Sequence, residues 1–267
     1  MAELPETKTL LLDAEPGWLT IWLNRPESRN ALSPEMVAEL QSVLEAIAFD
    51  RAFRGVTLRG RGGTFCAGGD IKGFSAMLAG EVSRQEVEDI SKVAGALFHR
   101  FNEYPKVTIA LVEGAATAGG LGLAAAADFV IATEDAKFAL TETALGIVPA
   151  QIAPLIVERI GTATARRIML TAARLDAEAA QKLGLADQIV PNGAAFDAAE
   201  KAIRAEVIRC APDANALTKS LVLQTLFLPG SSMIDFAAER FATAMLGDEA
   251  KEGISAFVEK RKPKWAE

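Results

Sequence analysis

The sequence predicts an α/β protein in which strands and helices alternate first and a purely helical region follows. Short β-branched runs at residues 17–24 and 107–114 indicate buried strands. Longer runs with apolar residues three and four positions apart indicate amphipathic helices, and they dominate from about residue 151 onward. The chain has 267 residues, 50% of them hydrophobic, which is enough for one large domain or for one domain with an appendage.

The expected strands lie mainly in the first half of the chain, and a turn at Glu15, Pro16 and Gly17 separates the first two. A lone strand is expected later, between helices. The expected strands are residues 9–15, 17–24, 55–60, 107–114, 128–135 and 186–191.

The expected helices begin with residues 33–50, where Ser33 is a suitable N-cap and Pro34 suits the first helical position. A helix over 83–104 carries an apolar stripe that includes Val87, Ile90, Ala94, Leu97 and Phe101, and Pro105 ends it. The apolar face of the first helix consists of Met36, Val37, Leu40, Val43, Leu44 and Ile47. The other expected helices start at residue 71 and span 152–161, 163–172, 176–184, 195–209, 212–226 and 233–260.

Composition excludes several classes of function. A net charge of −7 argues against nucleic-acid binding, and an anionic ligand would need a local basic patch. Cys66 and Cys210 form no disulfide framework and fit a reduced, cytoplasmic location. No secretory leader pattern and no charge-free apolar run of about 18 residues is found, so no membrane partner is expected. His99 is the only histidine, which excludes a multi-histidine metal site, and we expect it to be structural.

Two glycine loops follow expected strands, FCAGGD at residues 65–70 and TAGGLG at 117–122. Each has the order strand, bare loop, helix, so both loops should reach one edge of a sheet. Two backbone N–H groups that converge on one point form an oxyanion hole. Either loop taken singly is more commonly a packing or turn device. No phosphate-binding GxxxxGK[ST] loop is present, and His99 has no serine partner for a catalytic triad.

Glu142 lies in FALTETALGIVPAQIAP, residues 138–154, and is the only charged residue between Lys137 and Glu158. Acidic residues at a helix start are often capping groups only. A carboxyl group among apolar neighbours would also have its charged form disfavoured, which raises its pKa toward that of a useful acid or base. Both interpretations are compatible with the segment alone.

These motifs in this order resemble the crotonase superfamily of acyl-CoA enzymes. The resemblance rests on FCAGGD, on GAATAGGLGLAAAAD at residues 114–128 and on FALTETALGIVP at 138–149. LNRPESRNAL at 23–32 and AFVEKRKPKW at 256–265 extend it over nearly the whole chain. It implies a crotonase-like, Clp-protease-like spiral of strand-strand-helix turns, followed by a helical region that forms trimers or hexamers.

The resemblance places the spiral core in residues 1–192 and the oligomerisation region in 193–267. It implies that the backbone N–H groups of Ala67 and Gly119 hold a thioester oxygen and that Glu142 is the acid/base. Coenzyme A is then part of the substrate, and no separate cofactor or metal is implied. The substrate-binding residues that it implies are Arg25, Arg29, Ala31, Gly68, Asp70, Ile71, Gly120, Phe257 and Lys260, the last two either from this chain or from a neighbouring subunit.

Gly122 departs from the two-glutamate hydratases of the superfamily, which carry a second carboxylate at that position. The leading hypothesis is an enoyl-CoA hydratase that uses Glu142 alone, on a branched glutaconyl-type substrate whose own carboxylate helps to position water. The first alternative is an isomerase that converts 3-enoyl-CoA to 2-enoyl-CoA, since one carboxylate can move one proton between carbons. The second is an acyl-CoA-binding relative without turnover.

Three further expectations concern the surroundings of the site. The acyl chain is expected to lie against residues 73–80 and 147–152. Gln151 and Ile152 stand where most relatives have glycines, so they should reshape the acyl pocket or the water site. Cys66 has no histidine partner in its motif and is expected to pack rather than react. Without the resemblance, the basic KRKPK tail would fit a solvated helix end equally well.

Overall fold

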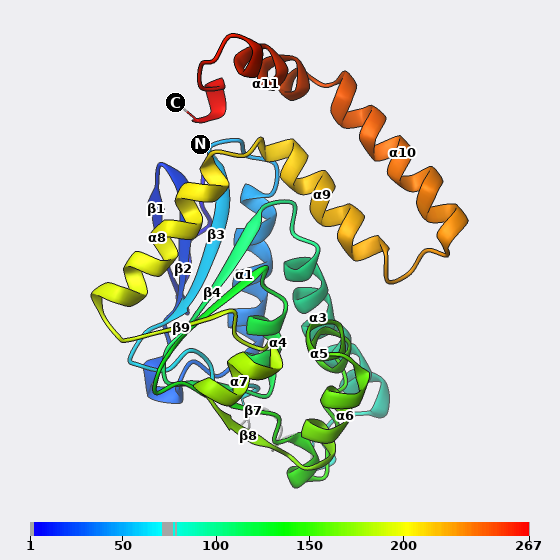
Figure 1. The fold of residues 1–267 in the computed structure, drawn as a ribbon. Helices are drawn as coiled ribbons and strands as arrows, with labels where there is room; N and C mark the ends of the chain where they lie inside the picture. The colour runs from blue at the N-terminus through cyan, green and yellow to red at the C-terminus, as the bar shows by residue number, and fades with distance from the viewer. Residues whose placement is uncertain (1–2, 71–76, 78, 267) are drawn as a thin grey trace.

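A six-stranded sheet forms the centre of the computed structural model, which describes residues 3–70, 77 and 79–266. Its strand order is β1-β2-β3-β4-β6-β9 (Figure 1). β1 is antiparallel to β2, and every later pair is parallel, so the strands from β2 onward end at the same edge. The strands are β1 Leu10–Glu15, β2 Gly17–Leu23, β3 Phe53–Gly60, β4 Val107–Val112, β6 Phe129–Thr133 and β9 Gln188–Val190.

A second, three-stranded sheet has the order β5-β7-β8 and was not predicted. Its strands are β5 Ala115–Thr117, β7 Lys137–Ala139 and β8 Arg174–Asp176. Each has only three residues, too few to show an alternating pattern in sequence. The expected lone strand near 186–191 is β9, and it is not alone, because it pairs with β6.

Helices cover both faces of the six-stranded sheet. α1, Pro34–Ile47, and α3, Arg84–Asn102, lie on one side, and α8, Ala194–Ile208, lies on the other (Figure 1). Alternation along β2 separates the faces, since Ile21 belongs to the core cluster with α1, whereas Trp18 packs with Phe196 of α8. α8 therefore packs on the sheet, although it lies within the expected oligomerisation region.

The expectations for α1 are confirmed, and those for α3 only in part. Ser33 caps α1 by accepting a hydrogen bond from the backbone N–H of Met36, and all six expected apolar positions of that helix are buried. α3 buries its second half around Leu97, but Val87 and Ile90 in its first half are 40% and 44% exposed. The apolar stripe in the sequence therefore runs along the whole helix, whereas only the second half of α3 packs against the core.

The C-terminal helices form an arm that extends away from the sheet (Figure 1). The expected helix over 233–260 is two helices, because the backbone of Gly247 is extended between them and breaks the α-helical run. The remaining helices are α4 Gly119–Ala125, α5 Ala153–Ile160, α6 Thr162–Leu170, α7 Ala177–Leu183, α9 Pro212–Gln224, α10 Gly230–Leu246 and α11 Asp248–Val258. The short 3₁₀ helices are η1 Pro26–Ser28, η2 Glu142–Leu145 and η3 Lys264–Ala266.

Large apolar side chains are exposed along this arm. Phe241 and Leu246 of α10 are 69% and 78% exposed, and Phe227, before α10, is 70% exposed. The arm is nevertheless tied to the body, since Lys219 of α9 lies 2.6 Å from Asp128 and donates to the carbonyl of Lys106. Within the described ranges, no helix is both long and apolar enough to cross a membrane.

Asn30 fixes the loops that follow β2 and β3. Its side-chain amide is fully buried and donates to the carbonyls of Arg61 and Thr64 at 2.9 and 2.7 Å. Its Oδ1 accepts a hydrogen bond from the N–H of Arg25 at 2.8 Å. One side chain thus satisfies three backbone groups of two loops.

Replacing this side chain should be costly. Asn30→Ala would leave those backbone groups without partners, so we expect the free energy of unfolding to fall by about 1–3 kcal/mol. Urea unfolding followed by circular dichroism measures the difference. Asn192→Ala, at an exposed asparagine, is the matched control and should change little. Equal stability of Asn30→Ala and wild type would contradict the role given to Asn30.

Candidate active site

Three loops stand side by side beyond the ends of the strands and extend the second sheet. Leu32 forms a parallel bridge with Gly69, and Cys66 forms one with Ala116 of β5. Because β5 pairs in turn with β7, these bridges place the loops after β2 and β3 next to the segment that leads to Glu142. The two glycine loops therefore do reach one edge, as the sequence indicated.

Gly119 offers its backbone N–H at the start of α4. Ala118, just before it, donates to the carbonyl of Ala139 and has a φ of 50°, a conformation that side-chain-bearing residues rarely adopt. This turn makes Gly119 the first residue of the helix, where an N–H has no acceptor within the helix. Gly119 itself is partly exposed.

Gly69 faces Gly119 from the neighbouring loop. Leu32 donates to the carbonyl of Gly68 and accepts from the N–H of Asp70, so the N–H of Gly69 between them points the other way. The Gly69 nitrogen lies 3.7 Å from the point where a Cβ on Gly119 would stand. Two backbone donors, one from each glycine loop, thus lie close together.

Ala67 is differently placed from what the resemblance implied. Its N–H donates to the carbonyl of Arg29 at 3.0 Å, as part of the pairing between the loops. A thioester oxygen could gain this donor only by breaking that bond. The backbone nitrogen that lies near Gly119 belongs instead to Gly69, two residues later in the same motif.

Glu142 lies three residues after β7, beside this edge. β5 and β7 pair in parallel with Thr117 opposite Ala139, so the chain continues from adjacent positions to Gly119 and to Glu142. The Glu142 side chain is 7% exposed, and its Oε2 is buried with no hydrogen-bond partner among the described residues. The exposed Leu145 and Val148 follow it.

Burial raises the pKa of the Glu142 carboxyl above its ordinary value, although the N–H groups of Glu142 and Thr141 donate to it and partly offset the shift. A carboxyl group with a raised pKa and one unpaired oxygen suits proton transfer to or from a ligand.

The wall next to Gly119 is apolar. A Cβ on Gly122 would overlap Cγ2 of Ile152 and stand 3.5 Å from Cε1 of Phe98. Cζ of the same phenylalanine lies 3.7 Å from the corresponding point on Gly119. The position where the resemblance implied a missing carboxylate is therefore filled by the Ile152 side chain. The sequence identified Gly122 and Ile152 as unusual, but it did not show that the two residues pack against each other.

Arg25, Arg29 and Asp70, which the resemblance places beside the substrate, lie in the same loops. Arg25 is half-buried, forms an ion pair with Asp70 at 3.1 Å and donates to the carbonyl of Ala31 at 2.8 Å. Arg29 is exposed. Ile71 and most of the segment 73–80 lie outside the described residues.

Gly68 and Gly120 have packing roles that restrict their side chains. Gly68 has a φ of 96°, and a Cβ there would stand 2.8 Å from the carbonyl oxygen of Thr117. A Cβ on Gly120 would overlap the carbonyl oxygen of Cys66, so α4 packs directly on the neighbouring loop. Both positions require glycine for the close approach that forms the site.

Phe257 and Lys260 lie at the opposite end of β3 from the glycine loops. Arg54, at the start of β3, donates to the carbonyl of Trp265 at 3.1 Å, whereas Gly60 at its end leads to FCAGGD. Phe257 is 85% exposed. Within one chain, the C-terminal tail and the glycine loops are therefore separated by the length of a strand.

Cys66 and His99 show no catalytic arrangement among the described residues. Cys66 is fully buried, and burial raises the pKa of its thiol to about 12, which favours packing over reactivity. His99 lies near the end of α3, 70% exposed and 3.1 Å from Glu103.

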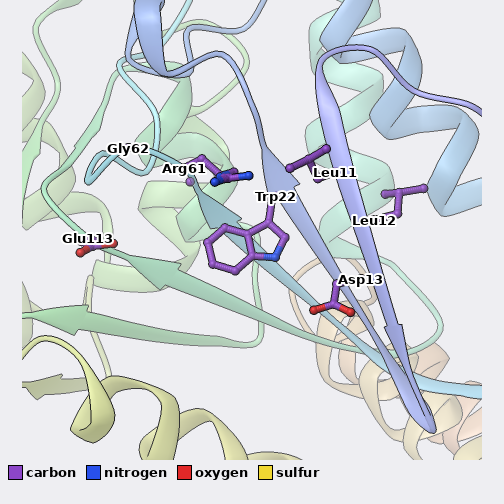
Figure 2. A pocket seen from close by; sticks show the side chains of 8 residues that line it. Leu11, Leu12, Asp13, Trp22, Arg61, Gly62 and Glu113 are labelled. Carbon is purple, nitrogen blue, oxygen red and sulfur yellow. The ribbon is translucent and has the colours of Figure 1, made fainter.

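A separate hollow of about 440 Å³ lies beside Trp22 of β2. Figure 2 shows the side chains that line it. Leu11 and Asp13 of β1 line one side, and Arg61 and Glu113 belong to the loops after β3 and β4. Neither Glu142 nor a glycine of FCAGGD or TAGGLG lines it. It is not part of the candidate site.

The chain is similar to known proteins over nearly its whole length. The family described as Enoyl-CoA hydratase/isomerase matches residues 13–267. A candidate enoyl-CoA hydratase of Thermus thermophilus is 39% identical over 259 residues, which cover 96% of this chain and 100% of that protein.

Solved structures agree with this match. Pseudomonas aeruginosa AtuE superposes with a TM-score of 0.93 at 46% identity, covering 97% of this chain and 100% of that one. An enoyl-CoA hydratase/isomerase from Marinobacter aquaeolei gives a TM-score of 0.91 at 43% identity, covering 97% and 99%. The crotonase-like α/β fold expected from the sequence is thereby confirmed.

The raised pKa of Glu142 predicts a pH-dependent stability. The folded chain holds this proton more tightly than the unfolded chain, so ionisation costs stability as pH rises above the ordinary value of 4.5 and through the raised one. Glu142→Gln carries no such charge. It should therefore melt at a higher temperature than wild type at about pH 8 and at the same temperature at about pH 4.

Differential scanning fluorimetry across this pH range measures the difference. Glu134→Gln, at an exposed glutamate, is the control and should follow wild type throughout. A Glu142→Gln difference that stays constant with pH would show that ionisation of Glu142 is not its cause.

Proposed function

The chain belongs to the enoyl-CoA hydratase/isomerase family, and we propose that it is a hydratase that adds water across the 2,3-double bond of an acyl-CoA thioester. The observation that carries the proposal is the buried carboxyl group of Glu142, with one oxygen unpaired among the described residues, at the sheet edge where the backbone nitrogens of Gly69 and Gly119 lie close together. The family membership and the hydratase names of relatives support this class of activity.

In this proposal the N–H groups of Gly69 and Gly119 bind the thioester oxygen. Attack on the β-carbon, or removal of a proton from the α-carbon, moves negative charge onto that oxygen as an enolate forms. Backbone donors that are already aimed at this charge lower the barrier, by about 3–4 kcal/mol for one such donor. The pairing of Leu32 with Gly69 and the turn at Ala118 hold the two donors in place before substrate arrives.

Glu142 is the proposed acid/base. Its carboxylate takes a proton from water as the oxygen bonds to the β-carbon, and its carboxylic acid then gives a proton to the α-carbon. The raised pKa suits both steps, because a proton that is held more tightly is removed from water more readily and is still transferable to carbon.

The substrate proposed here carries a carboxylate of its own, as in a branched glutaconyl-CoA. The side chains of Phe98 and Ile152 are apolar, so this wall has no group that could accept a second hydrogen bond from the attacking water. A carboxylate on the substrate would supply that missing acceptor.

A single observation favours 3-enoyl-CoA to 2-enoyl-CoA isomerisation as the second candidate. Ile152 fills the position of a second carboxylate, and moving a double bond requires only one proton carrier and no water. A relative that binds acyl-CoA without turnover is the remaining alternative.

Coenzyme A is proposed to lie along the loop of Arg25 and Arg29, whose charges suit its phosphates in a protein that is acidic overall. We further propose that α9 to α11 form the oligomerisation part of region 193–267, beyond the core. The tail residues Phe257 and Lys260 would then reach the nucleotide from a neighbouring subunit, in a trimer or hexamer in the cytoplasm.

The reaction class can be tested with three substrates. Purified protein is incubated with crotonyl-CoA, a 3-enoyl-CoA and 3-methylglutaconyl-CoA, and products are followed by mass and chromatography. We expect addition of water to 3-methylglutaconyl-CoA. Glu142→Gln should lower turnover by roughly 10²–10⁴-fold, because the proton carrier is lost, while acyl-CoA binding persists.

Glu134→Gln serves as the control and should keep full turnover. Double-bond migration without a mass change would establish the isomerase instead. Binding without change in any substrate would leave the non-catalytic relative, and full activity of Glu142→Gln would remove Glu142 from the mechanism.

The exposed apolar arm predicts self-association. We expect the protein to sediment as a trimer or hexamer in analytical ultracentrifugation. Phe241→Arg should shift it toward monomer, because a charge would enter an apolar contact. Arg166→Ala, on α6 and exposed, is a control outside the arm. Monomeric wild-type protein at micromolar concentration would contradict the assigned role of the arm.

A further inference from the structure

Ile152 and Gly122 fit one another as a steric pair. Ile152 is buried, with 4% of its surface exposed, at the residue preceding α5. Its Cγ2 occupies the place of a Cβ at position 122, and its own Cβ lies 3.0 Å from that point. Any side chain at position 122 would therefore have to displace Ile152.

A second pair holds Ile152 where it is. The neighbouring Gln151 inserts its side chain where a Cβ on Gly95 of α3 would stand. Its amide donates to the hydroxyl of Ser91, one turn earlier on the same helix, at 3.0 Å. The missing side chain of Gly95 thus provides the space that Gln151 needs, and Gln151 fixes the entry to α5.

These contacts determine which side chains lie beside the backbone donor of Gly119. Position 122 is one turn after Gly119 on α4, so it lies on the same helix face as the backbone donor. The Phe98 ring approaches both glycines. A surface hollow of about 440 Å³, lined by Gly95, Phe98 and Gln151, borders this wall. Phe98 and Ile152 therefore form an apolar wall beside the donor.

We propose that Ile152 is a specificity-determining residue that keeps water and any second acid/base group from the wall beside Gly119. This inference rests on the proposed function of the site. Ile152 and Phe98 bring no ionisable group to this wall, so Glu142 acts there without a second carboxyl group, and simple 2-enoyl-CoA substrates, which bring no carboxylate of their own, are hydrated slowly. The chain selects substrates that supply the missing acceptor.

Hydration of a simple 2-enoyl-CoA shows which group is missing when Ile152 packs against Gly122. Hydration breaks one O–H bond of water, joins the oxygen to the β-carbon and delivers a proton to the α-carbon. With two carboxyl groups, one accepts the proton from water while the other gives its proton to carbon. A glutamate at position 122 could serve only if Ile152 no longer filled its space.

The decisive experiment compares the full-length wild type with Gly122→Glu, with Ile152→Gly and with the double variant. For crotonyl-CoA, we expect kcat/KM of the double variant to exceed that of wild type and of either single variant by at least tenfold. The ratio of crotonyl-CoA to 3-methylglutaconyl-CoA turnover should rise in parallel. Ile152→Val keeps Cγ2, so it is the matched control and should leave this ratio unchanged.

A thermal cycle tests the packing independently of activity. Gly122→Ala should lower the melting temperature clearly in the presence of Ile152, and much less in the Ile152→Gly background. Equal losses in both backgrounds would show that the two positions are not coupled. If the double variant folds, binds acyl-CoA and keeps the wild-type substrate ratio, the inference is overturned.

The outcomes separate this inference from the proposed function. Wild-type protein inactive on all three acyl-CoA substrates would refute the proposed function. Wild-type protein that hydrates 3-methylglutaconyl-CoA, together with a double variant whose preference is unchanged, would refute the role of Ile152 alone. Rapid wild-type hydration of crotonyl-CoA would also refute it, because the apolar wall would then impose no selection.

Discussion

The site depends on backbone pairing between loops rather than on a set of side chains. The bridges of Leu32 with Gly69 and of Cys66 with Ala116 add the neighbouring loops to the three-stranded sheet. Hydrogen bonds of this kind fix direction as well as position, because alternate N–H groups of a paired segment point to opposite sides. One side holds the loops together, and the other presents Gly69 toward Gly119. The buried amide of Asn30 secures the same loops from behind.

The carboxyl group of Glu142 is buried beside these loops. Glu142 has lost most of its solvent but has gained only two backbone donors, so its charged form is poorly compensated. This is a cost to the folded chain, and it is also the property that suits Glu142 to the proton transfers proposed for it.

Local patterns in the sequence predicted the large elements well. Ser33, Pro34 and the apolar positions of α1 act through neighbours in the chain, so they are readable without tertiary structure. The three-residue strands β5, β7 and β8 are not, because their stability comes from partners distant in sequence. The extended Gly247 divides what reads as one helix into α10 and α11. The same limit applies within the site, where FCAGGD identified the loop but only its register with Leu32 distinguishes Gly69 from Ala67.

The interlock of Gly122 with Ile152 also restricts the order in which this sequence could change. A side chain gained first at position 122 would meet an occupied space and would cost stability before it could contribute chemistry. Loss of bulk at position 152 would have to come first to make that space available, and it would leave a cavity with a cost in stability of its own. Steric coupling of this kind makes the effect of one substitution depend on the other. Two residues that are neighbours in space thus constrain the order of substitutions at the site, although thirty positions separate them in the chain.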